Sequence, residues 1–73
     1  MGFSLSIVIP VYNEAGKIRN DITNLSAYLT KNRISSEIII SDDGSTDDTI
    51  KIASGTSIDE SIPLSVISTG EHS

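Results

Sequence analysis

A run of three isoleucines, Ile38–Ile40, is followed after one serine by two adjacent aspartates, Asp42 and Asp43, and then by a glycine. A short β-branched run of this kind is typical of a buried strand. The residues that follow the glycine, 45–49, are of the types that begin helices. Because ligands bind at the carboxyl ends of strands in open parallel sheets, this stretch predicts a strand over 37–41 whose end presents the two aspartates to a small molecule.

A second β-branched run, Leu5–Ile9, is followed by Pro10, which cannot donate a hydrogen bond to a neighbouring strand and therefore marks the end of the run as a strand. Between the two runs, apolar residues recur at spacings of four, three and four, which is the period of one helix face, at Ile18, Ile22, Leu25 and Leu29. We expect a helix from about Glu14 to Lys31, with Asn13 as its N-cap.

The remainder of the chain predicts a second helix and a third strand. Ser45 or Thr46 is expected to cap a short helix that ends at Gly55, and residues 63–68 form an apolar strand pattern. The order is β-α-β-α-β, so the strands should be parallel. The predicted fold class is α/β, a three-layer half of a doubly wound (Rossmann-like) parallel sheet with strand order 3-2-1.

Composition limits what this domain can be. With 73 residues there is room for one small domain, which we take as 1–73. A net charge of −5 without a Lys/Arg cluster argues against a nucleic-acid partner. The absence of cysteine excludes disulfides and thiolate metal sites, and the lone His72 is interpreted as a surface residue. The apolar run at 5–11 is too short for a membrane span, so we expect a cytoplasmic chain.

The first strand has a free side in this arrangement. In a complete doubly wound fold a further strand pairs there, so we expect the chain to be part of a larger domain. An apolar strand at the edge of a sheet is a site for pairing with another strand. The sequence therefore also predicts self-association through the edge of the first strand.

The ends of the first two strands should form one continuous rim, because adjacent strands lie about 4.8 Å apart. A carboxylate there could accept hydrogen bonds from a base N–H or a ribose, and a tyrosine could stack on a base. The first end carries Pro10, Tyr12, Asn13 and Glu14, and the second carries Asp42, Asp43, Gly44 and Ser45. Among them, the candidate nucleotide-binding residues are Pro10, Tyr12, Glu14, Asp42 and Asp43.

A simpler interpretation treats these acids as helix caps and turn residues, and applies most strongly to Asp47 and Asp48. Other motifs fit poorly. A calcium loop beginning at Asp42 would need a glycine at Asp47, and a phosphate loop would need a Gly-Lys-Ser/Thr sequence that is absent.

The two strand-end stretches, Ser6–Glu14 and Ile38–Thr49, resemble the N-terminal part of a family 2 glycosyltransferase with the GT-A fold. They are most similar to polyprenyl (dolichyl) phosphate mannosyl- and glucosyltransferases. The resemblance covers about 5–68, and its two motifs are specific for the family but not for the substrate.

This resemblance implies inverting transfer of a sugar from a nucleotide diphosphate donor, a UDP- or GDP-sugar, assisted by Mg²⁺ or Mn²⁺. It implies that Pro10, Tyr12 and Glu14 line the nucleoside pocket, that Asp43 accepts the base N–H, and that Asp42 lies near the ribose. The metal-binding motif and the catalytic base of the family would lie beyond residue 73, and membrane helices of some members would place the full-length protein at the cytoplasmic face of a membrane. The alternative hypothesis is a non-catalytic nucleotide-binding or assembly module.

Overall fold

The computed structural model describes residues 5–68. Its elements alternate between strand and helix, in the order β1 (Leu5–Val11), α1 (Ile18–Lys31), β2 (Ser36–Asp42), α2 (Thr49–Ser54) and β3 (Leu64–Ser68). This confirms the predicted β-α-β-α-β order. The interpretation of His72 lies outside the described residues. Within 5–68, neither helix has the length and apolar character needed to cross a membrane.

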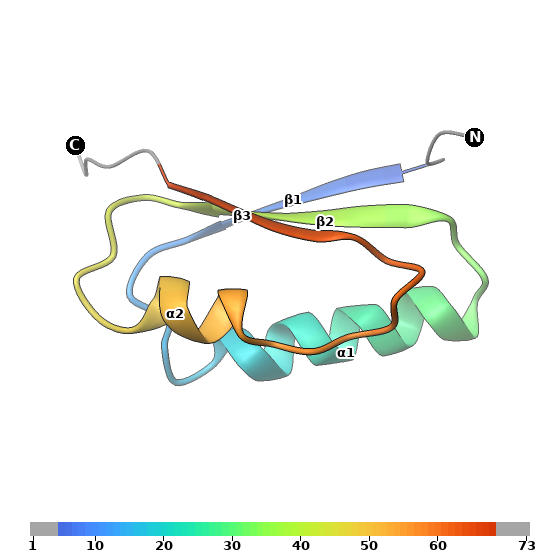
Figure 1. The fold of residues 1–73 in the computed structure, drawn as a ribbon, viewed down its shortest axis with the longest axis horizontal. Helices are drawn as coiled ribbons and strands as arrows, with labels where there is room; N and C mark the ends of the chain where they lie inside the picture. The colour runs from blue at the N-terminus through green and yellow to red at the C-terminus, as the bar shows by residue number, and fades with distance from the viewer. Residues whose placement is uncertain (1–4, 69–73) are drawn as a thin grey trace.

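The three strands form one parallel sheet in the order β1-β2-β3, so that β2 is central and β1 and β3 are edges. The predicted order 3-2-1 names the same neighbouring pairs, read from the opposite edge. Val11 lies opposite Asp42 in the register of β1 and β2, and Ile40 lies opposite Val66 in that of β2 and β3. The carboxyl ends of all three strands therefore point to the same end of the sheet (Figure 1).

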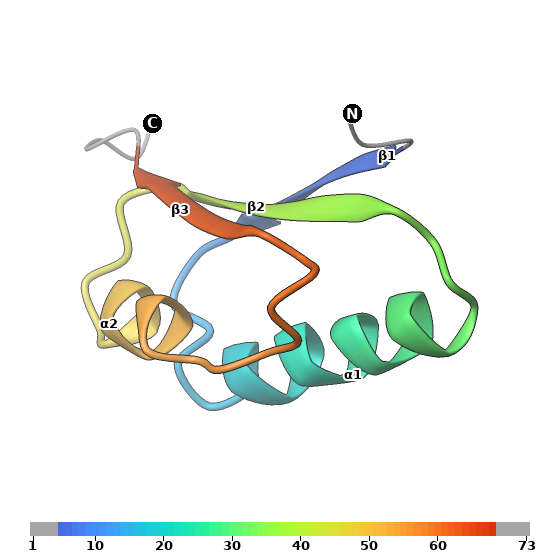
Figure 2. The same cartoon turned by 45° about the vertical axis from the view of Figure 1, so that its right-hand side comes forward.

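Both helices lie against the same face of the sheet, as Figures 1 and 2 show from two directions. The described residues thus form two layers, and for this part of the chain the predicted three-layer arrangement is wrong. The reason is that each crossover moves the chain one strand further in the same direction. Right-handed crossovers that run the same way place their helices on the same face.

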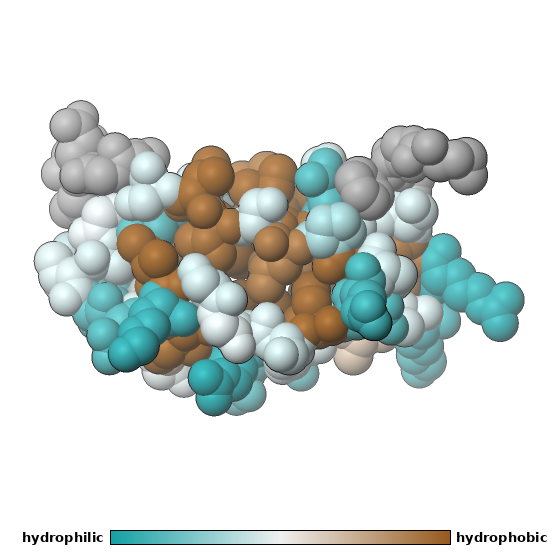
Figure 3. Space-filling model, viewed as in Figure 1, coloured by the Kyte–Doolittle hydropathy of each residue, from teal (hydrophilic) through white to brown (hydrophobic). Residues whose placement is uncertain are grey.

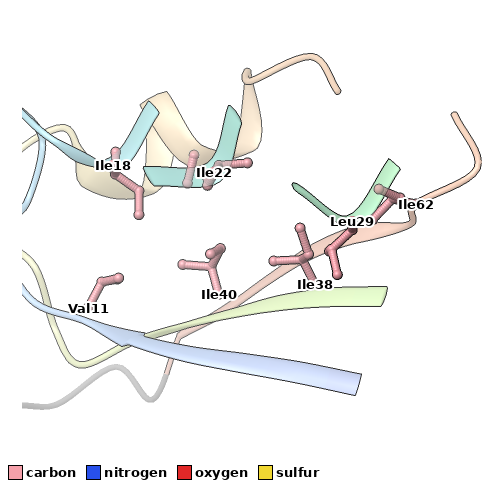
Figure 4. Packing of buried hydrophobic residues seen from close by; sticks show 8 residues of the cluster. Val11, Ile18, Ile22, Leu29, Ile38, Ile40 and Ile62 are labelled. Carbon is pink, nitrogen blue, oxygen red and sulfur yellow. The ribbon is translucent and has the colours of Figure 1, made fainter. Parts of the chain in front are cut away.

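The core lies between the sheet and the helices (Figure 4). Alternate side chains of a strand point to opposite faces, and in β2 the side chains of Ile38 and Ile40 point to the helices and are fully buried. The helix stripe predicted from the sequence supplies the opposing side chains. The buried apolar residues are Val11, Ile18, Ile22, Leu29, Ile38, Ile40, Ala53 and Ile62.

The opposite face of the sheet is not covered by the described residues. On this face Val8 is 58% exposed and Ile67 is 53% exposed. Figure 3 looks at the side of the molecule, as Figure 1 does, and shows apolar residues gathered in its middle, with hydrophilic residues towards both ends. Parallel sheets are ordinarily covered on both faces, whereas the part of the chain that the structure describes leaves apolar surface exposed on this one.

Strand β1 continues through Pro10 to Val11, two residues further than the sequence indicates. An edge strand tolerates proline where the missing N–H would face away from the neighbouring strand. The Val11 carbonyl accepts a hydrogen bond from the N–H of Asp43 at 3.0 Å, so pairing with the β2 side persists beyond the proline.

Helix α1 begins at Ile18 rather than at Glu14. Asn13 has a φ of 51°, in the left-handed region, and is therefore not an N-cap of the ordinary kind. The N–H groups of Lys17 and Ile18 both donate to the Glu14 carbonyl, which makes a turn ahead of the helix.

The other end of α1 is closed by a left-handed residue, Arg33, with a φ of 55°. Its N–H donates to the Thr30 carbonyl at 3.2 Å, and the N–H of Ile34 donates to the Leu29 carbonyl at 2.9 Å. This is the hydrogen-bond pattern of a Schellman motif.

The packing gives a matched pair of substitutions. Ile40→Val removes one methylene from a fully buried site, and we expect it to lower the free energy of unfolding by about 1 kcal/mol. Ile67→Val makes the same change in β3 at a half-exposed site, so its effect should stay within about 0.5 kcal/mol. Both residues are β-branched before and after the change, which keeps strand propensity constant. Urea denaturation measures both; equal losses would contradict the assignment of the core face.

Candidate functional site

Two loops meet at the carboxyl end of the sheet, residues 12–17 after β1 and residues 43–48 after β2 (Figures 1 and 2). The hydrogen bond from the Asp43 N–H to the Val11 carbonyl brings the first residue of the second loop beside the end of β1. The predicted rim is therefore formed by residues distant in the sequence and adjacent in space.

The two aspartates at this end have different surroundings. Asp42 continues the face of β2 that carries Ile38 and Ile40, and it is fully buried. Ser45 donates to its carboxylate twice, from the backbone N–H at 2.8 Å and from the hydroxyl. Asp43 is the next residue and is only half-buried.

The assignment of Asp42 to a position near the ribose stays a prediction, and the structure gives its carboxylate a role within the loop. Its carboxylate points into the layer between the sheet and the helices, where it closes the turn that Ser45 ends. A buried carboxylate needs such donors, because burial without hydrogen bonds strongly disfavours the charged form. Asp42 is thus a structural residue of the loop, and Asp43 is the aspartate at the accessible rim.

Ser45 and Thr46 do not cap a helix as predicted, because α2 begins only at Thr49 and Asp48 precedes it. They contact the first loop instead. The Thr46 N–H donates to the Asn13 side-chain oxygen at 2.8 Å, and the Asn13 N–H donates to the Ser45 hydroxyl oxygen at 2.9 Å. The two loops are therefore joined by a reciprocal pair of hydrogen bonds.

A second pair of hydrogen bonds joins the same loops further along. The Glu14 N–H donates to the Thr49 hydroxyl oxygen at 2.8 Å, and the Ala15 N–H donates to a carboxylate oxygen of Asp47 at 3.3 Å. The Thr49 hydroxyl in turn donates to Asp47. These contacts give partners to the N–H groups of Glu14 and Ala15, which lie ahead of the first residue of α1.

The same contacts alter the ionisation of Asp47. The hydrogen bond from the Thr49 hydroxyl is the main cause that lowers the pKa of Asp47 below its ordinary value. Desolvation opposes it, and the N–H groups of Thr49 and Ala15 add to the lowering. Hydrogen bonds to the charged form of a carboxyl group always act in this direction.

The other predicted site residues lie at the accessible side of the rim. Tyr12 is 41% exposed and Pro10 is exposed. Glu14 is half-buried, and one of its carboxylate oxygens lies 3.3 Å from the ammonium group of Lys17. Tyr12 offers an exposed aromatic face and Asp43 a hydrogen-bond acceptor at the same end of the sheet, and a flat ring that carries N–H donors would need both.

The sequence reasoning placed Asn13 and Ser45 at this end of the sheet but missed the hydrogen bonds that join them, with Thr46, across the two loops. Their residue types are also those of helix caps and turns, so the local pattern favours capping. The partners lie more than thirty positions apart, and only the three-dimensional structure brings them together.

The rim does not fit a divalent metal ion. Within 5–68 no group of three or more His, Cys, Asp or Glu side chains is placed to hold one. Asp42 is buried and takes two hydrogen bonds from Ser45, and Glu14 pairs with Lys17. Mg²⁺ or Mn²⁺ would need oxygen ligands that these residues do not provide.

Comparison with known proteins identifies the family of the chain. Residues 6–72 match the family described as "Glycosyl transferase family 2", and the chain belongs to that family. An uncharacterised glycosyltransferase from Synechocystis sp. is 45% identical over 51 residues, which cover 70% of this chain. The chain spans 16% of the length of that relative. No solved structure matches the chain significantly.

The pKa of Asp47 provides a test of the contacts between the loops. Thr49→Val removes the hydroxyl and should raise the pKa of Asp47 towards its ordinary value of 3.8. Because the folded pKa lies below the ordinary value, ionised Asp47 stabilises the fold above that value, and this contribution is lost as the pH falls through the lowered pKa. NMR titration of the carboxyl carbons measures the change.

The control for this test is Ser61→Ala. The hydroxyl and N–H of Ser61 lower the pKa of Asp59, away from the rim, so this variant should raise the pKa of Asp59 and leave that of Asp47 unchanged. A pKa of Asp47 that stays the same in Thr49→Val would show that the described contact does not control it.

Proposed function

We propose that this chain is the donor nucleotide-binding part of an inverting glycosyltransferase, which moves a sugar from a nucleotide diphosphate sugar to an acceptor, of which a polyprenyl phosphate is our candidate. The observation that carries the proposal is the position of Asp43 beside the end of β1, held by its N–H bond to Val11, which is followed in the chain by the exposed Tyr12. Membership of glycosyl transferase family 2 supports it.

In this proposal the carboxylate of Asp43 accepts a base N–H and the ring of Tyr12 packs on the base. Pro10 and Glu14 form the sides of the same pocket. Carboxylates dominate this rim, and its cation Lys17 pairs with Glu14. A negative rim repels a diphosphate, so the nucleoside end of the donor is the part that suits it. Asp42 acts indirectly, by holding the turn that follows Asp43.

In this proposal, a metal ion that assists the transfer is bound by ligands outside the described residues. The cytoplasmic location, at the face of a membrane in the full-length protein, stays a prediction.

The proposal is tested by calorimetric titration of the chain with UDP-glucose and with GDP-mannose, each with and without Mn²⁺. We expect weak binding of one nucleotide that changes little with the metal, and loss of that binding in Asp43→Ala. Truncation of a buried or half-buried hydrogen-bond partner of a ligand costs about 1–3 kcal/mol, enough to remove weak binding from the measurable range.

The matched control is Asp21→Ala, which removes an exposed carboxylate from α1 and should leave the affinity unchanged. Binding that survives Asp43→Ala would contradict the assigned role of Asp43. Absence of binding to the folded wild-type chain would contradict the proposal as a whole.

A second candidate function is a non-catalytic assembly module that pairs through β1. Two observations favour it: β1 is an edge of the sheet within the described residues, and its central residue Val8 is 58% exposed. Exposed apolar edge strands pair with other strands unless charge or shape prevents it.

Sedimentation velocity over a range of concentrations tests this candidate. We expect concentration-dependent association of the wild-type chain that Val8→Lys abolishes, because a lysine on an edge strand opposes pairing. Ile67→Lys places the same charge on the same face at the opposite edge and should leave association intact. Equal effects of the two substitutions would assign the association to the sheet face rather than to the β1 edge.

A further inference from the structure

Asn13 stands between two residues of the proposed nucleotide pocket, Tyr12 and Glu14. Its side-chain oxygen accepts the N–H of Thr46, and its own N–H donates to the Ser45 hydroxyl oxygen. Both partners belong to the loop that begins with Asp43. Asn13 therefore joins the two loops of the rim twice, once as a hydrogen-bond acceptor and once as a donor.

The backbone of Asn13 adds a second requirement. Its φ of 51° lies in the left-handed region, which most side chains avoid and which asparagine and aspartate tolerate best after glycine. Glycine would satisfy the backbone and supply no acceptor for Thr46. Alanine would satisfy neither requirement. The position therefore calls for a side chain that combines tolerance of this conformation with a short carbonyl or carboxylate acceptor.

The connection continues inward from Ser45. The hydroxyl that accepts from Asn13 also donates to the buried carboxylate of Asp42, which accepts the Ser45 N–H as well. The turn that carries Asp43 is thus held from the core side by Asp42 and from the β1 side by Asn13. Hydrogen bonds that are linked in this way reinforce one another.

We infer that Asn13 is a positioning residue for nucleotide binding, which fixes the spacing between Tyr12 and Asp43 before a nucleotide arrives. The inference rests on the proposed function and deepens it. Asn13 acts through the loop of Asp43 and itself needs no contact with the nucleotide. Its value to binding is that the two sides of the pocket are ordered in advance, so that less ordering remains when the ligand binds.

The bonds of Asn13 are exposed to solvent, so a purely structural role and a positioning role make different predictions. Loss of exposed hydrogen bonds changes overall stability little, because water replaces the lost partner. Loss of preorganisation weakens binding even when the fold is intact. The test therefore compares loop protection and affinity in variants that stay folded.

The decisive variant is Asn13→Gly, which keeps the left-handed backbone accessible and removes the acceptor. We expect the Thr46 amide to exchange its hydrogen about tenfold faster than in the wild-type chain, because its hydrogen bond is lost. We expect the dissociation constant for the bound nucleotide to rise about tenfold, because the loops are no longer ordered in advance. Amide exchange is followed by NMR, and affinity by the same calorimetric titration as above.

Two further variants separate the possible causes. Asn13→Asp keeps a short acceptor oxygen at the same place and should restore slow exchange at Thr46. Arg33→Gly makes a similar substitution at the other non-glycine residue with positive φ among those described, which lies at the far end of α1. It should leave both Thr46 exchange and nucleotide affinity unchanged.

Unchanged exchange at Thr46 in Asn13→Gly would overturn the inference, and this readout needs no nucleotide. Faster exchange with an unchanged dissociation constant would also overturn it, because Asn13 would then join the loops without affecting the pocket. A wild-type chain that binds no nucleotide would overturn the proposed function and the positioning role with it. Equal dissociation constants for the wild-type chain and Asn13→Gly would overturn the positioning role alone.

Discussion

The register between β1 and β2 decides where the polar residues of this chain lie. Val11 lies opposite Asp42, and the next residue along, Asp43, donates its N–H back to Val11. A shift of one residue would exchange the two faces of the strand. It would carry Asp43 into the core and Asp42 out to the surface. This register is the reason that Asp42 is buried and structural while the adjacent Asp43 is accessible.

The polar side chains of the two loops that follow these strands form hydrogen bonds mainly with the opposite loop. Asn13 bonds to Ser45 and Thr46, and Thr49 and Asp47 bond to the N–H groups of residues 14 and 15. Buried and half-buried loop backbone needs partners for its polar groups. In this domain the partners come from the opposite loop. The result is that the two loops are joined to each other at the end of the sheet where the proposed nucleotide site lies.

Much of the fold follows from local patterns. The two β-branched runs form two strands, and the stripe from Ile18 to Leu29 forms the buried face of α1, because burial of apolar side chains is the main driving force at those positions. The starts of the helices could not be predicted in the same way. Asn13, Ser45 and Thr46 have the chemistry of helix caps, and their actual partners are tertiary. The three-layer prediction failed because the direction of each crossover, rather than the strand pattern, decides which face a helix covers.

The candidate site was predicted in part. The meeting of the two strand ends follows from a parallel sheet, so Tyr12, Glu14 and Asp43 could be placed together from the sequence. The burial of Asp42 could not be predicted from the sequence. Two neighbouring aspartates look equivalent there, and only the structure shows that β2 extends through Asp42 and stops before Asp43.

The central claim is that a nucleoside binds between Tyr12 and Asp43. Backbone amide NMR spectra of the wild-type chain, recorded while UDP or GDP is added, test it most directly. The account predicts that shifts concentrate in the two loops, at residues 12–15 and 43–46, with the start of the strands unaffected. Shifts that centre instead on the open face of the sheet around Val8 and Ile67, or the absence of any shift at saturating nucleotide, would contradict it.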